Sequence, residues 1–481
     1  MLIILENLKS HYEIEQLTRM FTKDITVVCD GGEYQQQNDI LTVKRDEKVS
    51  INLCCNGKSY SQTIAADTDE DKMMLDICAV IYSMYTEAFE KKLAWGMLTG
   101  VRPVRLMRNL YAKHGSFDKV QDIFENQYFV SDEKIKLCSD IFALQKNIID
   151  SCQPKDYSLY ISVPFCPTRC SYCSFVSVGS TNATKLMEEY VEKLCKEIEY
   201  TAQTAQKAQL NLKTIYIGGG TPTSVSAEQL RRIMQTVKDN FDLSKVEEYT
   251  VEAGRPDCTT KEKLQVIKEL GADRVSINPQ TFSDEVLKAI GRKHTHQDFV
   301  DCYKMAKEMG FKTINTDLIA GLPLDTVEGF EKSLRGCIEL GAENITVHTL
   351  TLKRASNIVV DNQNNSYADV EQMLSKNALL GDSGYVPYYM YRQKSTLQSL
   401  ENVGFSQLGH ESLYNIYIME EIQSIISCGA GGVTKIVGTD GELKRIYNYK
   451  YPTEYVKDFD TILKRKDEVI SVCQQFGFLN D

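Results

Sequence analysis

The sequence predicts an α/β protein built around a partial (β/α)6 barrel, with an N-terminal α+β domain and a mixed, mostly helical C-terminal region. Three observations support this fold class. A strand-like run followed by an amphipathic helix recurs six times between residues 158 and 350, which is typical of βα units. The first 150 residues have a different pattern, with short strands followed by one long helix. The chain of 481 residues also exceeds what one hydrophobic core usually supports.

The predicted domain boundaries follow these changes of pattern. Residues 1–150 form the N-terminal α+β accessory domain, residues 151–385 the barrel, and residues 386–481 a C-terminal accessory region that covers the substrate. In the first domain, apolar periodicity favours a helix over residues 69–92. The segment 93–105 holds the only tryptophan and is either a functional lid or a packed turn. Strands of this domain are expected at residues 2–5, 25–29, 39–43 and 48–54.

Six parallel strands are expected in the barrel, each followed by a loop and a helix. The helices carry start signals, such as the capping box formed by Ser226 and Gln229. After residue 352 the alternation loosens, and the pattern favours a helix over residues 416–427. The barrel strands are expected at residues 158–163, 214–217, 249–253, 274–278, 312–319 and 344–350.

Composition excludes several classes of function. Hydrophobic residues make up 42% and charged residues 25%, and no run of about 18 apolar residues could span a bilayer, so we expect no membrane insertion. The N-terminus lacks the basic region of a signal peptide, so a cytoplasmic location with reduced thiols is expected. A net charge of -11 argues against general nucleic-acid binding, because phosphate neutralisation needs a basic surface.

Three cysteines lie close together at the end of the first predicted barrel strand. Cys166, Cys170 and Cys173 have the spacing C-x3-C-x2-C, and no fourth ligand follows at matching spacing. A structural zinc site takes four protein ligands, and an ordinary 4Fe-4S cluster takes four thiolates. The triplet therefore indicates a metal site with one open position. The alternative is a zinc loop that borrows a distant ligand.

Further candidate residues follow the predicted strands, where sites on parallel β/α folds form. The glycines 218–220 follow the second strand, Glu252 ends the third and Gln280 follows the fourth. Asp317 lies within the apolar fifth strand, where a charge is costly unless it is paired or bound to a ligand. Each feature alone has a structural explanation, but all of them at one rim of one barrel indicate a site.

Residues 160–352 resemble one branch of the radical S-adenosylmethionine superfamily. This branch contains the oxygen-independent coproporphyrinogen III oxidase, the heme chaperone HemW and the HemZ-type proteins, and the N-terminal domain is most similar to the HemZ type. Two departures from the oxidase are Phe175, where it has a fourth cysteine, and Ser162, where the family has histidine. The matching elements are Tyr160, the three cysteines, Gly218–Thr223, Glu252, Gln280, Arg292 and Asp317 with Gly321–Pro323.

The resemblance implies a radical SAM partial barrel and a set of cofactor roles. Cys166, Cys170 and Cys173 would hold a 4Fe-4S cluster whose open iron binds S-adenosylmethionine. Tyr160, Gly219 and Glu252 would contact that S-adenosylmethionine. The resemblance also allows a second S-adenosylmethionine, whose contacts would be Tyr172, Gly220, Thr221, Gln280, Arg292 and Asp317.

The function implied by the resemblance is the oxidative decarboxylation of coproporphyrinogen III to protoporphyrinogen IX. The alternatives are a heme chaperone and a radical enzyme that acts on heme or another tetrapyrrole. An electron donor such as flavodoxin or ferredoxin is the expected partner. The carboxylates of a tetrapyrrole substrate would need cations, for which the candidates are Arg102, Arg105, Lys353, Arg354 and Arg392.

Overall fold

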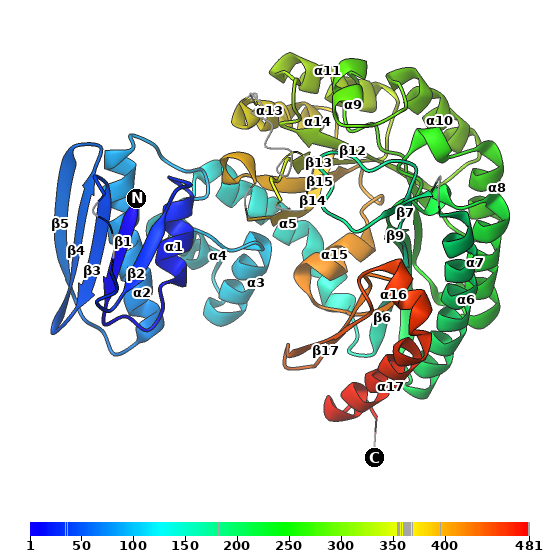
Figure 1. Ribbon diagram of the computed structural model, residues 1–481, viewed down its shortest axis with the longest axis horizontal. Helices are drawn as coiled ribbons and strands as arrows, with labels where there is room; N and C mark the ends of the chain where they lie inside the picture. Colours follow the sequence, from blue (N-terminus) through cyan, green and yellow to red (C-terminus); the bar gives the residue numbers. More distant parts are fainter. Residues whose placement is uncertain are drawn as a thin grey trace. The chain divides into compact units, whose positions relative to one another are not determined.

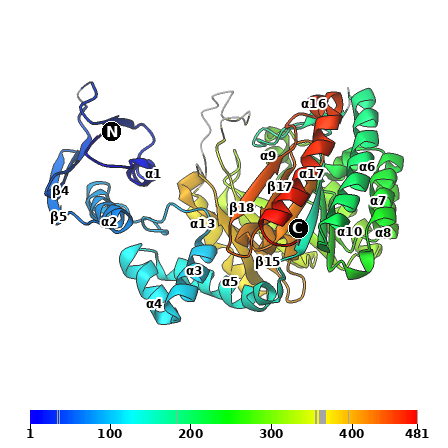
Figure 2. The same cartoon turned by 90° about the horizontal axis from the view of Figure 1, so that it is seen from below.

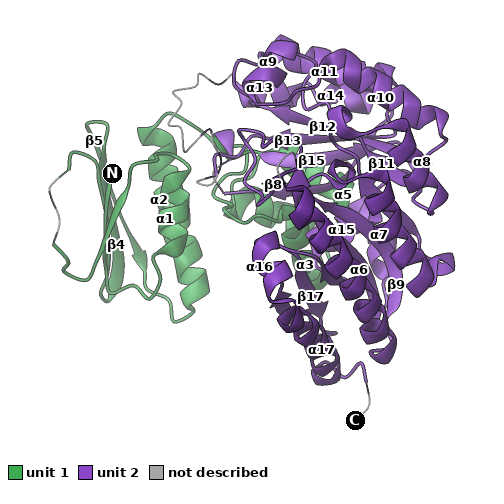
Figure 3. Ribbon diagram, turned by 45° about the vertical axis from the view of Figure 1, so that its right-hand side comes forward, with its two compact units in different colours: residues 1–142, 398–400 green, residues 143–397, 401–481 purple. Residues whose placement is uncertain are grey.

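The computed structural model divides the chain into two compact units (Figure 3). It describes all residues except 34, 36, 181, 182, 354, 355, 357, 359–366, 368, 395, 480 and 481. The first unit comprises residues 1–142 and 398–400, and the second residues 143–397 and 401–481. The division falls within helix α5 (Asp132–Ser151). The boundaries expected at residues 150 and 385 remain sequence-based predictions.

The first unit is an α+β structure. Its five strands pair in the order β2-β1-β3-β4-β5. In β4 every second side chain is buried, so that Val49, Ile51 and Leu53 pack in one core with Ile77 and Ile81 of the long helix α2. The elements are β1 (Leu2–Glu6), α1 (Tyr12–Arg19), β2 (Thr26–Cys29), β3 (Ile40–Arg45), β4 (Lys48–Cys55), β5 (Lys58–Ala65), α2 (Glu70–Ala88), α3 (Pro103–His114) and α4 (Phe117–Asp122).

The segment 93–105 is a packed turn. Trp95 and Leu98 are buried, and Gly96 has a φ of +52°. A Cβ atom at residue 96 would collide with the carbonyl oxygen of Tyr128, so both the conformation and the space favour glycine. Within this unit, the packing favours a packed turn over a functional lid.

The second unit contains an 11-stranded sheet whose centre consists of the six predicted barrel strands. These six strands are neighbours in sequence order, and each pair is parallel, which confirms the predicted partial barrel. They are almost continuously buried, as expected for strands that are covered on both faces, although several of the buried side chains are polar. Their bounds are β6 (Asp156–Val163), β9 (Asn211–Gly219), β10 (Glu248–Glu252), β11 (Arg274–Ser276), β12 (Thr313–Ala320) and β13 (Asn344–Thr349).

Helices pack side by side along the outer face of these strands (Figures 1 and 2). The expected capping box is present at the start of α7, where Ser226 and Gln229 each accept from the other's backbone N–H. The helices of the barrel are α6 (Thr184–Lys207), α7 (Ala227–Asn240), α8 (Lys261–Glu269), α9 (Asp284–Ala289), α10 (His296–Glu308) and α11 (Val327–Glu339).

The C-terminal residues extend the same sheet at both edges. Beyond β13, strand β15 (Glu401–Ser406) pairs antiparallel and is followed by β14 (Val386–Arg392) at the edge. Beyond β6, strand β16 (Ser424–Cys428) pairs parallel and leads to β17 (Val433–Val437) and β18 (Leu443–Tyr447). The remaining helices are α13 (Val370–Ser375), α14 (Ala378–Asp382), α15 (Leu413–Glu420), α16 (Pro452–Lys457) and α17 (Phe459–Gln475).

The helix expected over residues 416–427 is wrong in its second half. Helix α15 ends at Glu420, and residues 424–428 form a fully buried strand beside β6. A short apolar run is compatible with a buried strand or a helix, and only the pairing partner, more than 260 residues away, decides between them. Among the described residues, no helix combines the length and the apolar character that a membrane span requires.

Candidate functional site

A cavity of about 300 Å³ lies at the carboxyl ends of the barrel strands, where the sequence predicts the site. It is lined by the loop after β6 and by the ends of β9, β10, β12 and β13. Most of the predicted site residues line this one cavity. They are Cys166, Cys170, Tyr172, Cys173, Gly219, Gly220, Thr221, Glu252, Gln280, Arg292, Asp317 and Lys353.

The three cysteines lie on the loop between β6 and α6. Burial raises the pKa of the Cys166 and Cys173 thiols, and the Cys166 sulfur accepts a hydrogen bond from Thr221 Oγ1 at 3.5 Å. All fifteen cysteines of the chain are free of disulfides. Among the described residues, no three His, Cys, Asp or Glu side chains are arranged to hold a metal ion together. The three thiols line one cavity.

The glycines at the end of β9 allow β6 and the cysteine loop to approach closely. A Cβ atom on Gly220 would lie 2.6 Å from the carbonyl oxygen of Phe165, and one on Gly219 would lie 2.7 Å from Ser162 Oγ. Gly219 also has a φ of +103°. The Thr221 amide donates to the Phe165 carbonyl at 2.7 Å, which fixes the start of the cysteine loop on this turn. The sequence thus uses glycine here for backbone packing as well as for access to the cavity.

Glu252 ends strand β10 with its carboxyl group buried at the cavity. Its Oε1 accepts a hydrogen bond of 2.6 Å from the Tyr216 hydroxyl. Burial raises the pKa of Glu252 to about 7, and the nearby charge of Asp317 adds to this rise. A buried carboxyl group with a raised pKa at the edge of a cavity is a candidate ligand contact.

Asp317 lies on β12 in a polar network that includes residues from neighbouring strands. Its two carboxylate oxygens accept from the amides of Asn278 at 2.7 Å and Asn315 at 2.9 Å. His348 on β13 places Nε2 3.7 Å from Oδ1. Burial opposes ionisation, but the hydrogen bond and charge of His348 outweigh it and hold the pKa of Asp317 below its usual range. Asp317 is therefore a fixed anion within the cavity, whereas Glu252 is not.

Arg292 is a buried cation beside the cysteine loop. Its Nη1 donates to the carbonyl oxygens of Asn278 at 2.7 Å and Gly254 at 3.1 Å, and Nη2 donates to the Tyr172 hydroxyl at 3.3 Å. Its buried Nε has no hydrogen-bond partner among the residues that the structure describes. Buried donors are normally satisfied, so this one is available to a bound ligand. Gln280 is buried nearby with a φ of +66°, a conformation that is uncommon for residues other than glycine and that recurs at functional sites.

Arg255 is a site residue that the sequence analysis missed. It follows β10 by three positions, is 3% exposed, and donates from Nη1 to the Cys170 sulfur at 3.6 Å. His348 was missed as well and lines the cavity from β13. Both residues come at or just after the end of a strand, as Glu252 does, and that position is the signal that could have revealed them.

Some predicted residues are not brought to the cavity. The ring of Tyr160 stacks on that of Tyr216 with centroids 6.2 Å apart and does not line the cavity, although Tyr216 itself binds Glu252. Arg392 is buried on β14 opposite Glu401 and is not a lining residue. Arg102 and Arg105 belong to the start of α3 in the first unit, and Arg354 lies outside the described residues.

Comparisons with known proteins agree with this site. A family profile described as the radical SAM superfamily matches residues 160–336. The chain is 34% identical over 482 residues to the oxygen-independent coproporphyrinogen-III oxidase-like protein HemZ of Bacillus subtilis, covering 97% of this chain and 96% of that one. It is 40% identical over 200 residues to the heme chaperone HemW of B. subtilis, covering 41% of this chain and 51% of that one. The solved coproporphyrinogen III oxidase HemN of Escherichia coli is similar in fold, with a TM-score of 0.52, 22% identity, and coverage of 67% of this chain and 73% of that one.

The barrel, its cysteine loop and these matches define a radical SAM protein, a class that uses a 4Fe-4S cluster and S-adenosylmethionine. Within that class, the chain belongs to the family of oxygen-independent coproporphyrinogen III oxidase-like proteins. The residues present fit these cofactors. Three free thiols line one cavity, Arg292 Nε lacks a partner there, and Gly219 and Gly220 leave backbone exposed to it.

Proposed function

We propose that the protein carries out the oxygen-independent oxidative decarboxylation of coproporphyrinogen III to protoporphyrinogen IX. The observation that carries this proposal is the similarity to the oxidase-like HemZ protein, which extends over nearly the whole of both chains. The match to the heme chaperone is stronger in identity but covers about half of the chaperone. The similarity to HemZ therefore extends to the N-terminal accessory domain.

In this proposal, Cys166, Cys170 and Cys173 hold the 4Fe-4S cluster and leave one iron for S-adenosylmethionine. When bound, the cluster and S-adenosylmethionine supply reductive cleavage of the sulfonium and abstraction of a hydrogen atom from the substrate. A carrier of the flavodoxin or ferredoxin type would deliver the electron. The resident residues bind, orient and shield the reactants from water.

The polar residues of the cavity suit an adenosine and a carboxylate. Glu252 and Asp317 offer acceptors for ribose hydroxyls or an amine, and Arg292 offers an unpartnered N–H to a carboxylate. Tyr160 acts in this proposal through Tyr216, whose hydroxyl fixes the Glu252 carboxyl group. Gly219 lets its backbone approach the first S-adenosylmethionine, and the contacts of a second one would be Tyr172, Gly220, Thr221, Gln280, Arg292 and Asp317.

Two lining residues suit a tetrapyrrole with carboxylate side chains. Phe175 lines the cavity and is 65% exposed, so its ring can pack on the face of a pyrrole. The Lys353 ammonium lies 5.9 Å from the centre of that ring, and burial lowers its pKa. A substrate carboxylate at Lys353 would offset this desolvation. Together the pair offers an apolar face and a cation, which a propionate-bearing ring requires.

Incubation of the anaerobically reconstituted protein with coproporphyrinogen III, S-adenosylmethionine and a reductant tests the proposal. We expect carbon dioxide, a tetrapyrrole with two fewer carboxylates, and 5'-deoxyadenosine in amounts that rise together. Formation of 5'-deoxyadenosine without any loss of carbon dioxide would overturn the decarboxylation while leaving the radical SAM class intact.

A heme chaperone is the second candidate, and two observations favour it. Phe175 occupies the position where the oxidase has a fourth cysteine, and the barrel is 40% identical to that of a chaperone. The same incubation distinguishes the two candidates when heme is added in a parallel sample. Tight, stoichiometric heme binding with no decarboxylation would favour the chaperone.

A further inference from the structure

Arg255 is held rigidly in the interior by a two-point ion pair. Its Nε donates to Asp257 Oδ1 at 2.9 Å and its Nη2 donates to Asp257 Oδ2 at 2.7 Å. Burial opposes ionisation of Asp257, but the hydrogen bonds and charge of Arg255 outweigh it and lower the pKa of Asp257. Both partners are therefore charged, and the fork geometry fixes the direction in which the guanidinium points.

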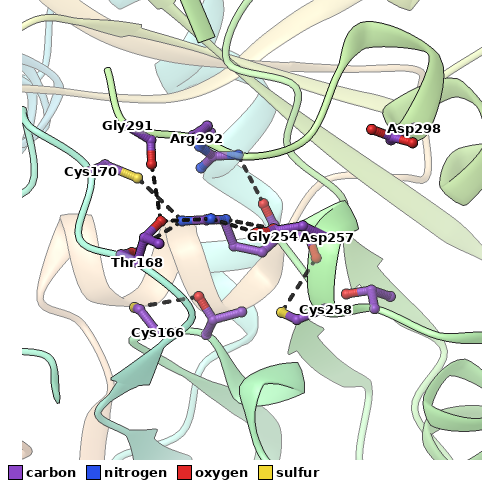
Figure 4. Close-up of polar contacts among 12 residues, drawn as sticks. Cys166, Thr168, Cys170, Gly254, Asp257, Cys258, Gly291, Arg292 and Asp298 are labelled. Carbon is purple, nitrogen blue, oxygen red and sulfur yellow. Dashed lines mark hydrogen bonds and ion pairs between the residues drawn. The ribbon is translucent and has the colours of Figure 1, made fainter. Parts of the chain in front are cut away.

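The remaining donors of this guanidinium all go to the cysteine loop. Nη1 donates to the Cys170 sulfur at 3.6 Å and to the Thr168 carbonyl at 3.2 Å, and Nη2 donates to Thr168 Oγ1 at 3.0 Å. Figure 4 shows Thr168 and Cys170 near one another, with Asp257 across from them. Arg255 thus connects the end of β10 to the middle cysteine of the triplet.

A cation that donates to a sulfur ligand changes the electron affinity of an iron-sulfur cluster. Reduction adds one negative charge to the cluster and its thiolates, so a nearby positive charge and a hydrogen bond to sulfur stabilise the reduced form. In a buried site this effect is only weakly screened by water. Asp257 acts in the opposite direction, because its negative charge opposes the added electron.

We propose that Arg255 is a positioning residue that raises the reduction potential of the cluster through Cys170, and that Asp257 sets the size of this effect. The inference rests on the proposed placement of the cluster on Cys166, Cys170 and Cys173. Its consequence is that an external one-electron carrier of low potential can reduce the cluster more completely.

The direct test is an EPR-monitored redox titration of reconstituted Arg255→Gln, with iron and sulfide content measured on the same sample. At the wild-type midpoint potential we expect about a tenfold lower ratio of reduced to oxidised cluster, which corresponds to about 59 mV for one electron. Arg231→Gln is the matched control, because Arg231 pairs with Glu269 at the surface of the same unit and should leave the potential unchanged. A wild-type midpoint in Arg255→Gln would overturn the inference.

Asp257→Asn separates an electrostatic role from a structural brace. Removing this carboxylate leaves the Arg255 charge uncompensated, so the midpoint should rise, in the direction opposite to Arg255→Gln. If the Arg255–Asp257 pair only braces the cysteine loop, the midpoint potential should shift in the same direction in both variants. If Arg255→Gln assembles no cluster, Asp257→Asn decides: a raised midpoint supports the inference, and an unchanged or lowered one overturns it.

The titration and the iron analysis also separate this inference from the proposal on which it rests. Wild-type iron content in Cys170→Ala would refute the placement of the cluster itself. Loss of iron in Cys170→Ala together with a wild-type midpoint in Arg255→Gln would refute the role of Arg255 alone.

Discussion

The two ends of strand β10 each carry a buried glutamate, and the two carboxyl groups differ in their hydrogen-bond partners. Glu248 at the amino end accepts hydrogen bonds from Leu413 N at 2.7 Å, Ser412 Oγ at 3.0 Å and Tyr414 N at 3.4 Å. These donors lie at the start of α15, where unpaired amides favour an anion. Glu252 at the carboxyl end accepts hydrogen bonds from the Tyr216 hydroxyl and the Gly219 backbone N–H, and faces the cavity.

The comparison distinguishes a buried carboxyl group whose partners the chain supplies from one that faces the cavity. Burial raises the pKa of both carboxyl groups. At Glu248 the chain supplies the partners itself, as expected for a buried polar group with a structural role. At Glu252 the chain supplies fewer donors, which is costly for a buried carboxyl group.

The largest effect is expected when the proposed ligands of the cluster are removed. Cys166→Ala, Cys170→Ala or Cys173→Ala should abolish iron binding and the brown colour of the reconstituted protein, because each thiolate holds a separate iron. Cys195→Ala on α6, outside the cavity, is the control and should keep its iron. Wild-type iron content in any of these three variants would contradict the placement of the cluster at the carboxyl ends of the barrel strands.

Removing each glutamate in turn sharpens the contrast in stability. Glu248→Ala should lower the free energy of unfolding by about 3 kcal/mol, since it removes the acceptor of four hydrogen bonds, one of them from Thr250 Oγ1. Glu252→Ala should cost about 1 kcal/mol or less, because fewer hydrogen bonds are lost and a desolvated carboxylate is removed. Denaturant unfolding at pH 8 measures both, and equal losses would refute the distinction.

The pH dependence of stability gives a signed effect at Glu252. Its pKa rises from 4.5 in the unfolded chain to about 7 in the fold, so its contribution is fully present below pH 4.5 and is lost as pH rises through about 7. Glu252→Gln should therefore match the wild type near pH 4 and exceed its stability by about 3 kcal/mol at pH 8. The measurement uses the protein without cofactors. A wild type that stays the more stable of the two at pH 8 would contradict the assignment of the pKa.

The smallest expected effect concerns the cation at the cavity. Lys353→Gln should raise the KM for coproporphyrinogen III about tenfold with little change in the binding of S-adenosylmethionine, as expected when one partly buried ion pair is lost. Lys268→Gln is the matched control, since Lys268 also lies over an aromatic ring, Phe311, but outside the cavity. An equal change in both variants would remove Lys353 from the substrate site.

Local patterns in the sequence were sufficient to predict the six parallel strands of the barrel. Its strands are short buried runs, most of them followed by a helix with its own start signals, so β6 and β9 to β13 could be predicted from short windows. Strand β16 could not, because its identity depends on a partner more than 260 residues away. Arg255 was missed for a similar reason, since its role depends on Cys170, which approaches it only in the fold.

The most direct test of the account is the EPR spectrum of the reduced, reconstituted protein before and after addition of S-adenosylmethionine. We predict the signal of a single 4Fe-4S cluster that changes on addition of S-adenosylmethionine, because one iron has no protein ligand to displace. Zinc in place of iron and sulfide, or a cluster signal that S-adenosylmethionine leaves unchanged, would contradict the central claim.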